Sequence, residues 1–360
     1  DVYKRQAQMA KDLGKTEDYE YFQNRSLNYR NQLDQDVRYA RIRSSSGNWI
    51  EPFKEFSGGG FIEGNPWQYT FYAPHDLQGV INFLGKDEYL KRLNWGFESS
   101  RESKFNATGD QYARYPINHG NQPNMQAAFL FNYAAAPWHT QRWTREILDI
   151  YYGTTPEHGW PGDEDEGQMG AWFVMSSLGL FQMQGGCGIG PIYDLGSPLF
   201  KKATIKLENG KQIEIIAKNN SKENVYVQSA KLNGKPLNKS WIHCSDIQHG
   251  GKLEFVMGPK PNTNWGVAPL PPSVSKPGET FEEKVDLFID AENLMNDDSR
   301  KFLKPVTVSI RSNKKNGTIK YTTDDSEPDM DSEEYSKPFE LAQTATVKAR
   351  VFDDKGDALS

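Results

Sequence analysis

The first stretch of the sequence that could carry out chemistry is a glycine-rich segment, residues 58–69, which contains a single carboxylate, Glu63. Gly58–Gly60 precede it, and four aromatic residues follow: Trp67, Tyr69, Phe71 and Tyr72. Glycines let the backbone approach a ligand closely. Apolar neighbours favour the protonated carboxyl, the form that a general acid needs near neutral pH. A solvated glutamate on a glycine-rich loop is an equally good interpretation of this segment taken alone.

The second stretch is an acidic segment, residues 161–169, in which Asp163, Glu164, Asp165 and Glu166 are consecutive and an apolar run follows at 171–175. Carboxylates at the start of a helix are favoured by the helix dipole and by backbone N–H donors, which also keep them ionised. Ionised carboxylates can act as a general base toward water or bind a hard cation such as calcium. The spacing does not fit an EF-hand loop. Because most acidic helix starts are only caps, this segment alone favours a cap.

The third stretch is the His-Gly-Asn segment, residues 118–123, in which Asn118, His119, Asn121 and Gln122 are polar. Its amides and imidazole could bind hydroxyl groups or a cation, and a polar turn before a helix is at least as good an interpretation. No histidine spacing in the chain is typical of a zinc site. The chain also has no nucleophile elbow, no phosphate-binding loop and no dinucleotide fingerprint.

The elements that must position these segments are predicted from the spacing of apolar residues. Spacings of three and four residues predict helices over 16–31, 76–83, 87–99, 125–135, 138–151 and 165–180. These six helices show no sign of forming a small closed bundle. We therefore expect them to be part of a larger helical array. Functional residues are then expected on the loops at one end of it.

The periodicity changes after residue 185. Alternation at 203–207, 212–217 and 225–227, with Asn-Gly turns at 209–210 and 233–234, predicts an antiparallel β-domain. Proline-rich residues 259–278 predict a linker. Renewed alternation at 306–310, 318–321 and 347–351 predicts a small β-sandwich.

Composition limits the class of protein. A chain of 360 residues exceeds one ordinary core, so two or three domains are expected. The net charge of −6 does not favour binding to the negatively charged backbone of nucleic acid. No apolar run approaches the ~18 residues of a membrane span. Two cysteines, Cys187 and Cys244, exclude a disulfide framework and leave either one bridge or, more in keeping with their usual burial, two thiols.

Several motifs in the same order resemble the calcium-dependent exo-α-mannosidases of glycoside hydrolase family 92. The glycine-rich segment, Pro74-His75-Asp76, the His-Gly-Asn segment and the acidic segment carry the resemblance, which continues through 196–200 and 232–237 to 271–273. It covers about three quarters of the chain. The tail, from 317 to 350, resembles the small Ig-like domain at the C-terminus of chitobiases and β-hexosaminidases.

The resemblance implies an α + β multidomain fold. Residues 1–185 would form part of an (α/α)6 catalytic barrel, 186–272 a β-domain packed on the barrel, and 273–360 a linker and an Ig-like accessory domain. Members of the family carry a β-sandwich and the first barrel helices before this region, so we expect the chain to be the C-terminal portion of a longer enzyme. A periplasmic, cell-surface or secreted location is expected for such an enzyme.

The resemblance also implies removal of terminal α-mannose from mannosides or N-glycans with inversion, which needs an acid on one side of the glycosidic bond and a base on the other. Glu63 matches the acid, and Asp163 and Asp165 match the base. The resemblance implies calcium as the cofactor, with Asn121 and Gln122 as candidate ligands. The expected substrate-binding residues are Trp67, His75, Asp76, His119 and Gln122.

One departure from the family pattern and two other functions remain open at this point. Many members have glutamate at the position of Gln122, which leaves the linkage preference open. An inverting glycosidase for another sugar would keep its activity when cations are chelated. A non-catalytic fragment would bind mannose without hydrolysing it.

Overall fold

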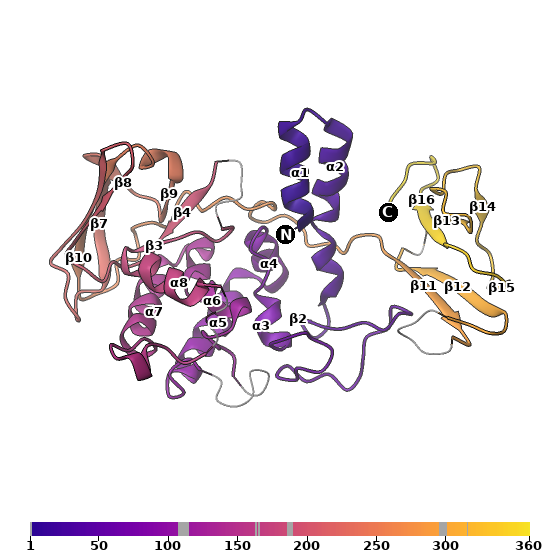
Figure 1. The fold of residues 1–360 in the computed structure, drawn as a ribbon, viewed down its shortest axis with the longest axis horizontal. Coiled ribbons are helices and arrows are strands. Elements are labelled where there is room, and N and C mark those ends of the chain that lie inside the picture. Colours follow the sequence, from indigo (N-terminus) through magenta and orange to yellow (C-terminus); the bar gives the residue numbers. More distant parts are fainter. Residues whose placement is uncertain are drawn as a thin grey trace. The chain divides into compact units, whose positions relative to one another are not determined.

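A computed structural model describes residues 2–106, 115–162, 164, 166–185, 190–294, 301–314 and 316–360. The chain has an α + β fold that divides into two compact units (Figure 1). The large unit comprises Asp1–Leu27, Gln35–Ala40 and Lys54–Phe281, and the small unit comprises Asn28–Asp34, Arg41–Phe53 and Glu282–Ser360.

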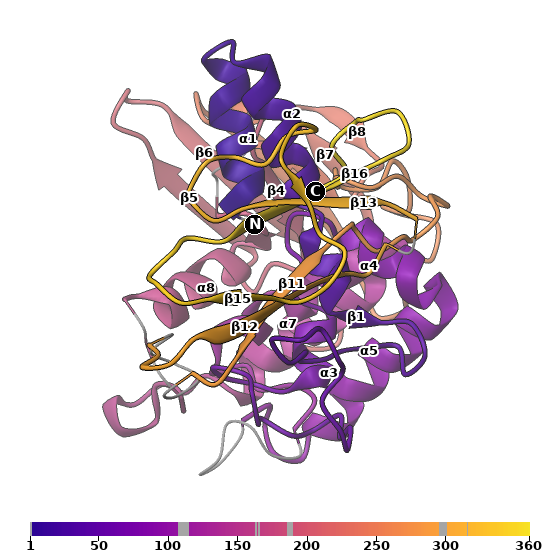
Figure 2. The same cartoon turned by 90° about the vertical axis from the view of Figure 1, so that its right-hand side faces the viewer.

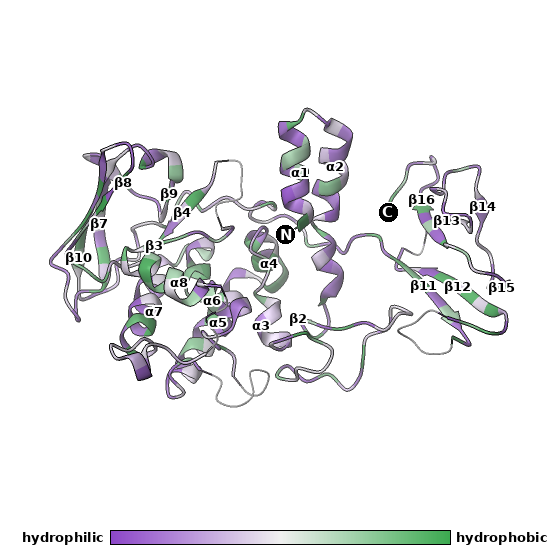
Figure 3. Ribbon diagram, in the orientation of Figure 1, coloured by the Kyte–Doolittle hydropathy of each residue, from purple (hydrophilic) through white to green (hydrophobic). Residues whose placement is uncertain are grey.

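The large unit contains most of the helices. Its α-helices are α1 (Val2–Asp12), α2 (Thr16–Arg25), α3 (Pro66–Thr70), α4 (Leu77–Leu84), α5 (Lys86–Ser100), α6 (Gln122–Met125), α7 (Pro137–Ile150) and α8 (Gln168–Ser177), and its 3₁₀ helices are η2 (Ala127–Ala134), η3 (Pro156–His158) and η4 (Cys244–Asp246). The predicted helices are confirmed with shifted ends, except that residues 125–135 form the end of α6 and a 3₁₀ helix, and α1 was not predicted. The hydrophobic helix α4 is almost wholly buried, whereas the hydrophilic α2 has no buried residue (Figure 3).

The main sheet of the large unit has five strands in the order β5-β6-β10-β7-β8. Their bounds are Lys202–Lys206, Gln212–Lys218, Gly251–Gly258, Tyr226–Leu232 and Lys235–Leu237. The β5–β6, β10–β7 and β7–β8 pairs are antiparallel as predicted. The prediction is wrong for β6 and β10, which run parallel. The late strand β10 inserts between the two hairpins, and this central position buries Leu253 and Phe255 completely.

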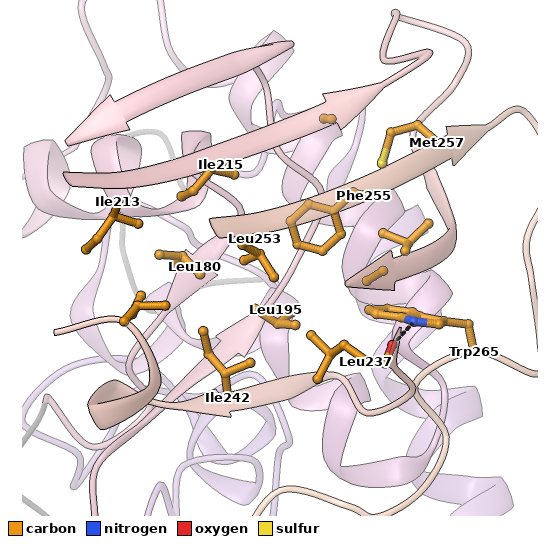
Figure 4. Packing of buried hydrophobic residues seen from close by; sticks show 14 residues of the cluster. Leu180, Leu195, Ile213, Ile215, Leu237, Ile242, Leu253, Phe255, Met257 and Trp265 are labelled. Carbon is orange, nitrogen blue, oxygen red and sulfur yellow. Dashed lines mark hydrogen bonds between the residues drawn. The ribbon is translucent and has the colours of Figure 1, made fainter. Parts of the chain in front are cut away.

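The core under this sheet also includes a part of the proline-rich segment (Figure 4). A second sheet, β3 (Leu180–Phe181), β4 (Ile192–Leu195) and β9 (Trp241–His243), contributes Leu180, Leu195 and Ile242 to that core. Trp265 is buried there, and its indole N–H donates to the carbonyl of Leu237 at 2.8 Å. The interpretation of 259–278 as a linker is therefore wrong around Trp265, because the buried indole fixes that stretch to the sheet.

The small unit contains two antiparallel three-stranded sheets, whose strands are labelled in Figure 2. One sheet consists of β11 (Leu287–Glu292), β12 (Val306–Ser312) and β15 (Phe339–Leu341), and the other of β14 (Glu333–Glu334), β13 (Thr318–Thr322) and β16 (Lys348–Phe352). Val306, Val308 and Ile310 from β12 pack with Tyr321 from β13, so the two sheets share one core. Within the parts of the chain that the structure describes, no helix is long and apolar enough to cross a membrane.

One buried carboxyl in the large unit makes stability depend on pH. Asp194 on β4 is completely buried and accepts hydrogen bonds from two neutral groups, the Asn132 amide and the Tyr133 hydroxyl. Burial raises the pKa of Asp194 to about 7. Between about pH 4 and pH 7 the folded protein then keeps a proton that the unfolded chain has released, so stability falls as pH rises across this window.

We expect Asp194→Asn to remove this fall, because asparagine keeps the shape and carries no titrating proton. The loss of unfolding free energy attributable to Asp194 is on the order of 4 kcal/mol between pH 4 and pH 8. Denaturant unfolding at several pH values measures it. Asp149→Asn is the matched control, since the Asp149 side chain is 64% exposed. Equal slopes in the wild type and both variants would contradict the prediction.

Candidate active site

The loop that carries Glu63 is held by the helix that follows it. Gly64 has φ +71°, and Asn65 caps α3 by accepting a hydrogen bond from the Gln68 N–H at 3.0 Å. The side-chain amides of Asn65 and Gln68 both donate to the carbonyl of Tyr115, at 3.4 and 3.0 Å. These bonds connect the glycine-rich segment to the chain that leads into the His-Gly-Asn segment.

Glu63 itself is half-buried. Burial and, second, the negative charge of Glu63 raise the pKa of the Tyr72 hydroxyl, so the Glu63 carboxylate acts electrostatically on that hydroxyl. Partial burial beside aromatic residues favours the protonated form of a carboxyl, the form that a general acid needs.

The structure places Trp67 and His75 inside the fold. Trp67 is 1% exposed, its ring centroid lies 4.9 Å from that of Phe71, and its indole fills the space beside Gly96. It is therefore not available to stack on a sugar ring. His75 is 3% exposed and its Nε2 lies 2.8 Å from the Ser26 carbonyl. Burial lowers the pKa of His75 to about 4, so its imidazole is neutral near pH 7.

Asp76 ties α4 to the proline-rich segment. Its carboxylate accepts hydrogen bonds from the N–H of Gly79 at 3.2 Å and from the hydroxyl of Ser273 at 3.1 Å. The backbone N–H and the hydroxyl of Ser275 each donate to it at 2.7 Å. Asp76 is completely buried, so these contacts give it a role in the fold.

His119 joins the His-Gly-Asn segment to the helix behind the acidic segment. Its imidazole is 1% exposed, and its ring centroid lies 4.2 Å from that of Trp172 on α8. Its Nε2 lies 3.0 Å from the Tyr152 hydroxyl, which itself donates to the Met169 carbonyl. The Tyr152 oxygen therefore accepts from an N–H on Nε2. Burial lowers the pKa of His119 to about 3, so the ring is neutral near pH 7 and serves as a hydrogen-bonded part of the packing.

The loops of these two segments also touch directly. A Cβ atom on Gly120 would lie 3.0 Å from the Cα of Gly162 and 3.2 Å from the carbonyl oxygen of Pro161, and would collide with the Tyr151 hydroxyl. Only glycine fits such an approach without displacement. In addition, α3 packs beside α6, so the glycine-rich segment adjoins the His-Gly-Asn segment. The structure thus brings all three segments into one region, although about a hundred residues separate the first from the last.

The carboxylates expected to activate water, Asp163 and Asp165, lie outside the described residues, so their distance from Glu63 stays a prediction. Their neighbour Glu164 is described. Its Oε1 accepts from the N–H of Gly170 at 3.2 Å, and its carbonyl accepts from the N–H of Gln168, before and within the first turn of α8. Glu164 therefore caps the helix, as the sequence alone favours for this segment.

Asn121 and Gln122 present amide groups that the described structure does not satisfy. The side-chain nitrogens of both are buried and have no hydrogen-bond partner among the described residues. An amide can turn to exchange its nitrogen and oxygen, and amide oxygens are ligands that calcium accepts. The two residues therefore fit part of a calcium site. Within the described ranges, no group of three His, Cys, Asp or Glu side chains could hold a metal.

Sequence reasoning missed the residues that connect the segments. The Tyr115 carbonyl, the Tyr152 hydroxyl and the Trp172 ring carry the links, and the only available signal was the density of aromatic residues around 151–172. Of the two cysteines, Cys244 is a half-buried free thiol that accepts from the Gln182 amide at 3.1 Å. Cys187 lies outside the described residues.

The described part of this region thus holds a half-buried carboxyl, Glu63, on a loop that adjoins the His-Gly-Asn segment. Residues 5–259 match the model of the glycosyl hydrolase family 92 catalytic domain, and residues 308–359 match the model named Fn3 associated. The chain belongs to glycosyl hydrolase family 92.

Solved structures of this family are similar to the chain. One is a family GH92 α-mannosidase from Bacteroides thetaiotaomicron, with a TM-score of 0.69 and 39% identity over 78% of this chain and 37% of that chain. It has also been solved with mannoimidazole. An inverting family GH92 mannosidase from the same organism has a TM-score of 0.68 and 31% identity, over 76% of this chain and 39% of that chain.

A curated relative is described as an uncharacterized secreted glycosidase from Arthroderma benhamiae. It is 31% identical over 218 residues, which are 59% of this chain and 26% of that protein. The chain thus spans about a quarter to two fifths of the length of these relatives.

Proposed function

We propose that the full-length gene product containing this chain hydrolyses terminal α-linked mannose from mannosides or N-glycans with inversion of the anomeric carbon. The observation that carries the proposal is the match of residues 5–259 to the family 92 catalytic domain. The 39% identity to a mannosidase and the 31% identity to an inverting mannosidase support the sugar and the stereochemistry.

Glu63 is proposed as the general acid. Its half-buried position beside Tyr72 and its placement on a braced glycine-rich loop support this role. The carboxyl would protonate the glycosidic oxygen as the bond to the anomeric carbon breaks. Asp163 and Asp165 are proposed to take the proton from the attacking water on the opposite face. An inverting pair needs a separation of roughly 6.5–9.5 Å to hold that water, and we expect this range between Glu63 and Asp165.

Positioning of the sugar is proposed to fall to the His-Gly-Asn segment. Gln122 is half-buried and its amide nitrogen has no described partner, so the amide can donate to a sugar hydroxyl or, when turned, bind a cation through its oxygen. His119 would hold this loop against α8 through Tyr152 and Trp172. Trp67, His75 and Asp76, which are buried, would support the loops from behind.

Calcium is the proposed cofactor, with the amide groups of Asn121 and Gln122 among its ligands. When bound, such a hard cation binds and orients sugar hydroxyls through oxygen contacts. The chain's own amides would hold the cation at the loop, beside the region where Glu63 donates its proton.

The domain organisation predicted from sequence is kept as part of the proposal. Residues 1–185 would contribute to an (α/α)6 barrel, 186–272 would form a β-domain on it, and 273–360 would include an Ig-like accessory domain. The two sheets with one core in the small unit are consistent with the last of these. A periplasmic, cell-surface or secreted location is proposed because one relative is described as a secreted glycosidase.

The proposal is tested by incubating the full-length gene product with α-linked mannobioses and with α-glucosides and α-galactosides of the same linkage. Free mannose is expected from one or more mannobioses, with no release from the other sugars. Release of another sugar would support a different specificity on the same site. Binding of mannobiose by a folded protein without any hydrolysis would contradict the proposed activity.

A further inference from the structure

The residues around Glu63 include an apolar strip that the large unit leaves in contact with water. Ile62, directly before the proposed acid, is 94% exposed, and Tyr72 is 41% exposed. Phe61 and Tyr69 are partly exposed beside them. We call these four residues, Phe61, Ile62, Tyr69 and Tyr72, the Glu63 ledge.

The rings of the Glu63 ledge are ordered against one another. Phe61 stacks on Tyr69 with a centroid separation of 5.2 Å and an angle of 28°. Tyr69 meets Tyr72 edge to face at 6.0 Å and 84°. The left-handed turn at Gly64 brings its backbone against the Tyr69 ring, where a Cβ atom would lie 3.2 Å from Cε2. The loop is therefore shaped around these rings.

The exposure of Ile62 leaves free energy available to a ligand. Isoleucine is among the residue types most often buried, and covering its side chain with a ligand would remove apolar surface from water, which favours binding. Single exposed apolar residues are common and need no explanation. Ile62 differs because it directly follows Phe61 of the ordered ring cluster and directly precedes the residue proposed to donate the proton.

We propose that the Glu63 ledge binds the leaving-group side of the substrate, the sugar or other group that is released after protonation. This inference rests on the proposed role of Glu63 as general acid. The acid must come within hydrogen-bond reach of the glycosidic oxygen, which belongs to the leaving group. Ile62 directly precedes Glu63 and is exposed, so we infer that its side chain contacts the group attached to that oxygen.

The chemistry of the Glu63 ledge suits the C–H face of a pyranose ring. Aromatic rings and an aliphatic side chain provide large apolar contact with few polar groups, as ligand sites generally do. The Tyr72 hydroxyl adds one group that can hydrogen-bond to the leaving sugar. The Glu63 ledge would therefore recognise the leaving sugar and would not contact the terminal mannose.

The test uses Ile62→Ala in the full-length gene product with two substrates. An α-linked mannobiose fills the Glu63 ledge, whereas α-mannosyl fluoride has a leaving group too small to reach it. We expect kcat/KM for the mannobiose to fall about tenfold. Lost apolar contacts in a hydrophobic pocket cost roughly 10–200-fold, and an exposed surface such as the Glu63 ledge lies at the low end of that range. The value for the fluoride is expected to stay within twofold, and Ile62→Leu is expected to restore most of the loss.

The matched control is Val256→Ala on β10, which removes another exposed β-branched side chain (36% exposed) and is expected to change neither substrate. An equal loss on both substrates would overturn the inference, because Ile62 would then position the acid or be covered by another segment of the protein. No loss on either would overturn it as well. A folded wild type that hydrolyses neither substrate overturns the proposed function and the Glu63 ledge together.

Discussion

Replacing Glu63 by glutamine is expected to lower the turnover of unactivated α-mannosides by on the order of 10²–10⁴-fold, while activated aryl mannosides keep most of their rate. Glutamine preserves the shape of the side chain and removes its proton. A sugar leaving as an alkoxide needs that proton, whereas an aryl group with a low pKa leaves without it. Steady-state kinetics on a mannobiose and on a dinitrophenyl α-mannoside, with the full-length gene product, measure the difference.

Two further variants distinguish the acid from other carboxylates. Asp165→Asn removes the proposed base, so it should be severe on both substrates, because neither leaving group supplies a nucleophile. Glu164→Gln is the matched control, since Glu164 caps α8 through the N–H of Gly170 and has no proposed chemical role. Equal damage to both substrates by Glu63→Gln, with folding unchanged, would mean that Glu63 positions the substrate and that the acid lies elsewhere.

Chelation of calcium is expected to abolish activity, and added calcium to restore it. At Asn121 and Gln122 the loop holds two amide side chains whose buried nitrogens have no described partner, and with the amides turned their oxygens would bind a hard divalent cation. No neutral side chain supplies an equivalent charge to orient sugar hydroxyls. Turnover in EGTA, followed by titration with calcium and with magnesium, tests this expectation. Undiminished turnover in the chelator would refute it.

One pair of variants tests whether the expected calcium requirement arises from this loop. Asn121→Ala is expected to raise the calcium concentration that gives half-maximal activity. Asn82→Ala removes an amide on α4 that is already bound to the carbonyl of Lys276 and is expected to leave that concentration unchanged. Equal shifts in both variants would show that the effect comes from lowered stability and not from the metal site.

Local patterns predicted the elements well, because helix periodicity and strand alternation depend on neighbouring residues. The parallel pairing of β6 and β10 was not predictable, since these strands are distant in sequence and β10 lies between two hairpins that each form locally. Similarly, composition cannot distinguish an aromatic ring that lines a site from one that fills a core. Trp67 and Asp76 match functional motifs, yet both are buried and serve the packing around α3 and α4.

In the candidate site, too, local features were predictable and long-range contacts were not. The residue types pointed to three segments with acid, base and cation-binding chemistry, and the contact between Gly120 and Gly162 brings two of them together. That contact, and the link from His119 to Tyr152 and Trp172, join residues 33 or more positions apart in sequence. A single sequence contains no direct signal for such long-range contacts.

The stereochemistry of the first product tests the central claim most directly. Proton NMR of the anomeric region, recorded during hydrolysis of an aryl α-mannoside and before mutarotation, distinguishes the two anomers of free mannose. An acid and a base that hold water between them deliver that water to the face opposite the leaving group. We therefore predict that β-mannose accumulates first. Initial formation of α-mannose would show retention and would contradict the proposed roles of Glu63 and Asp165.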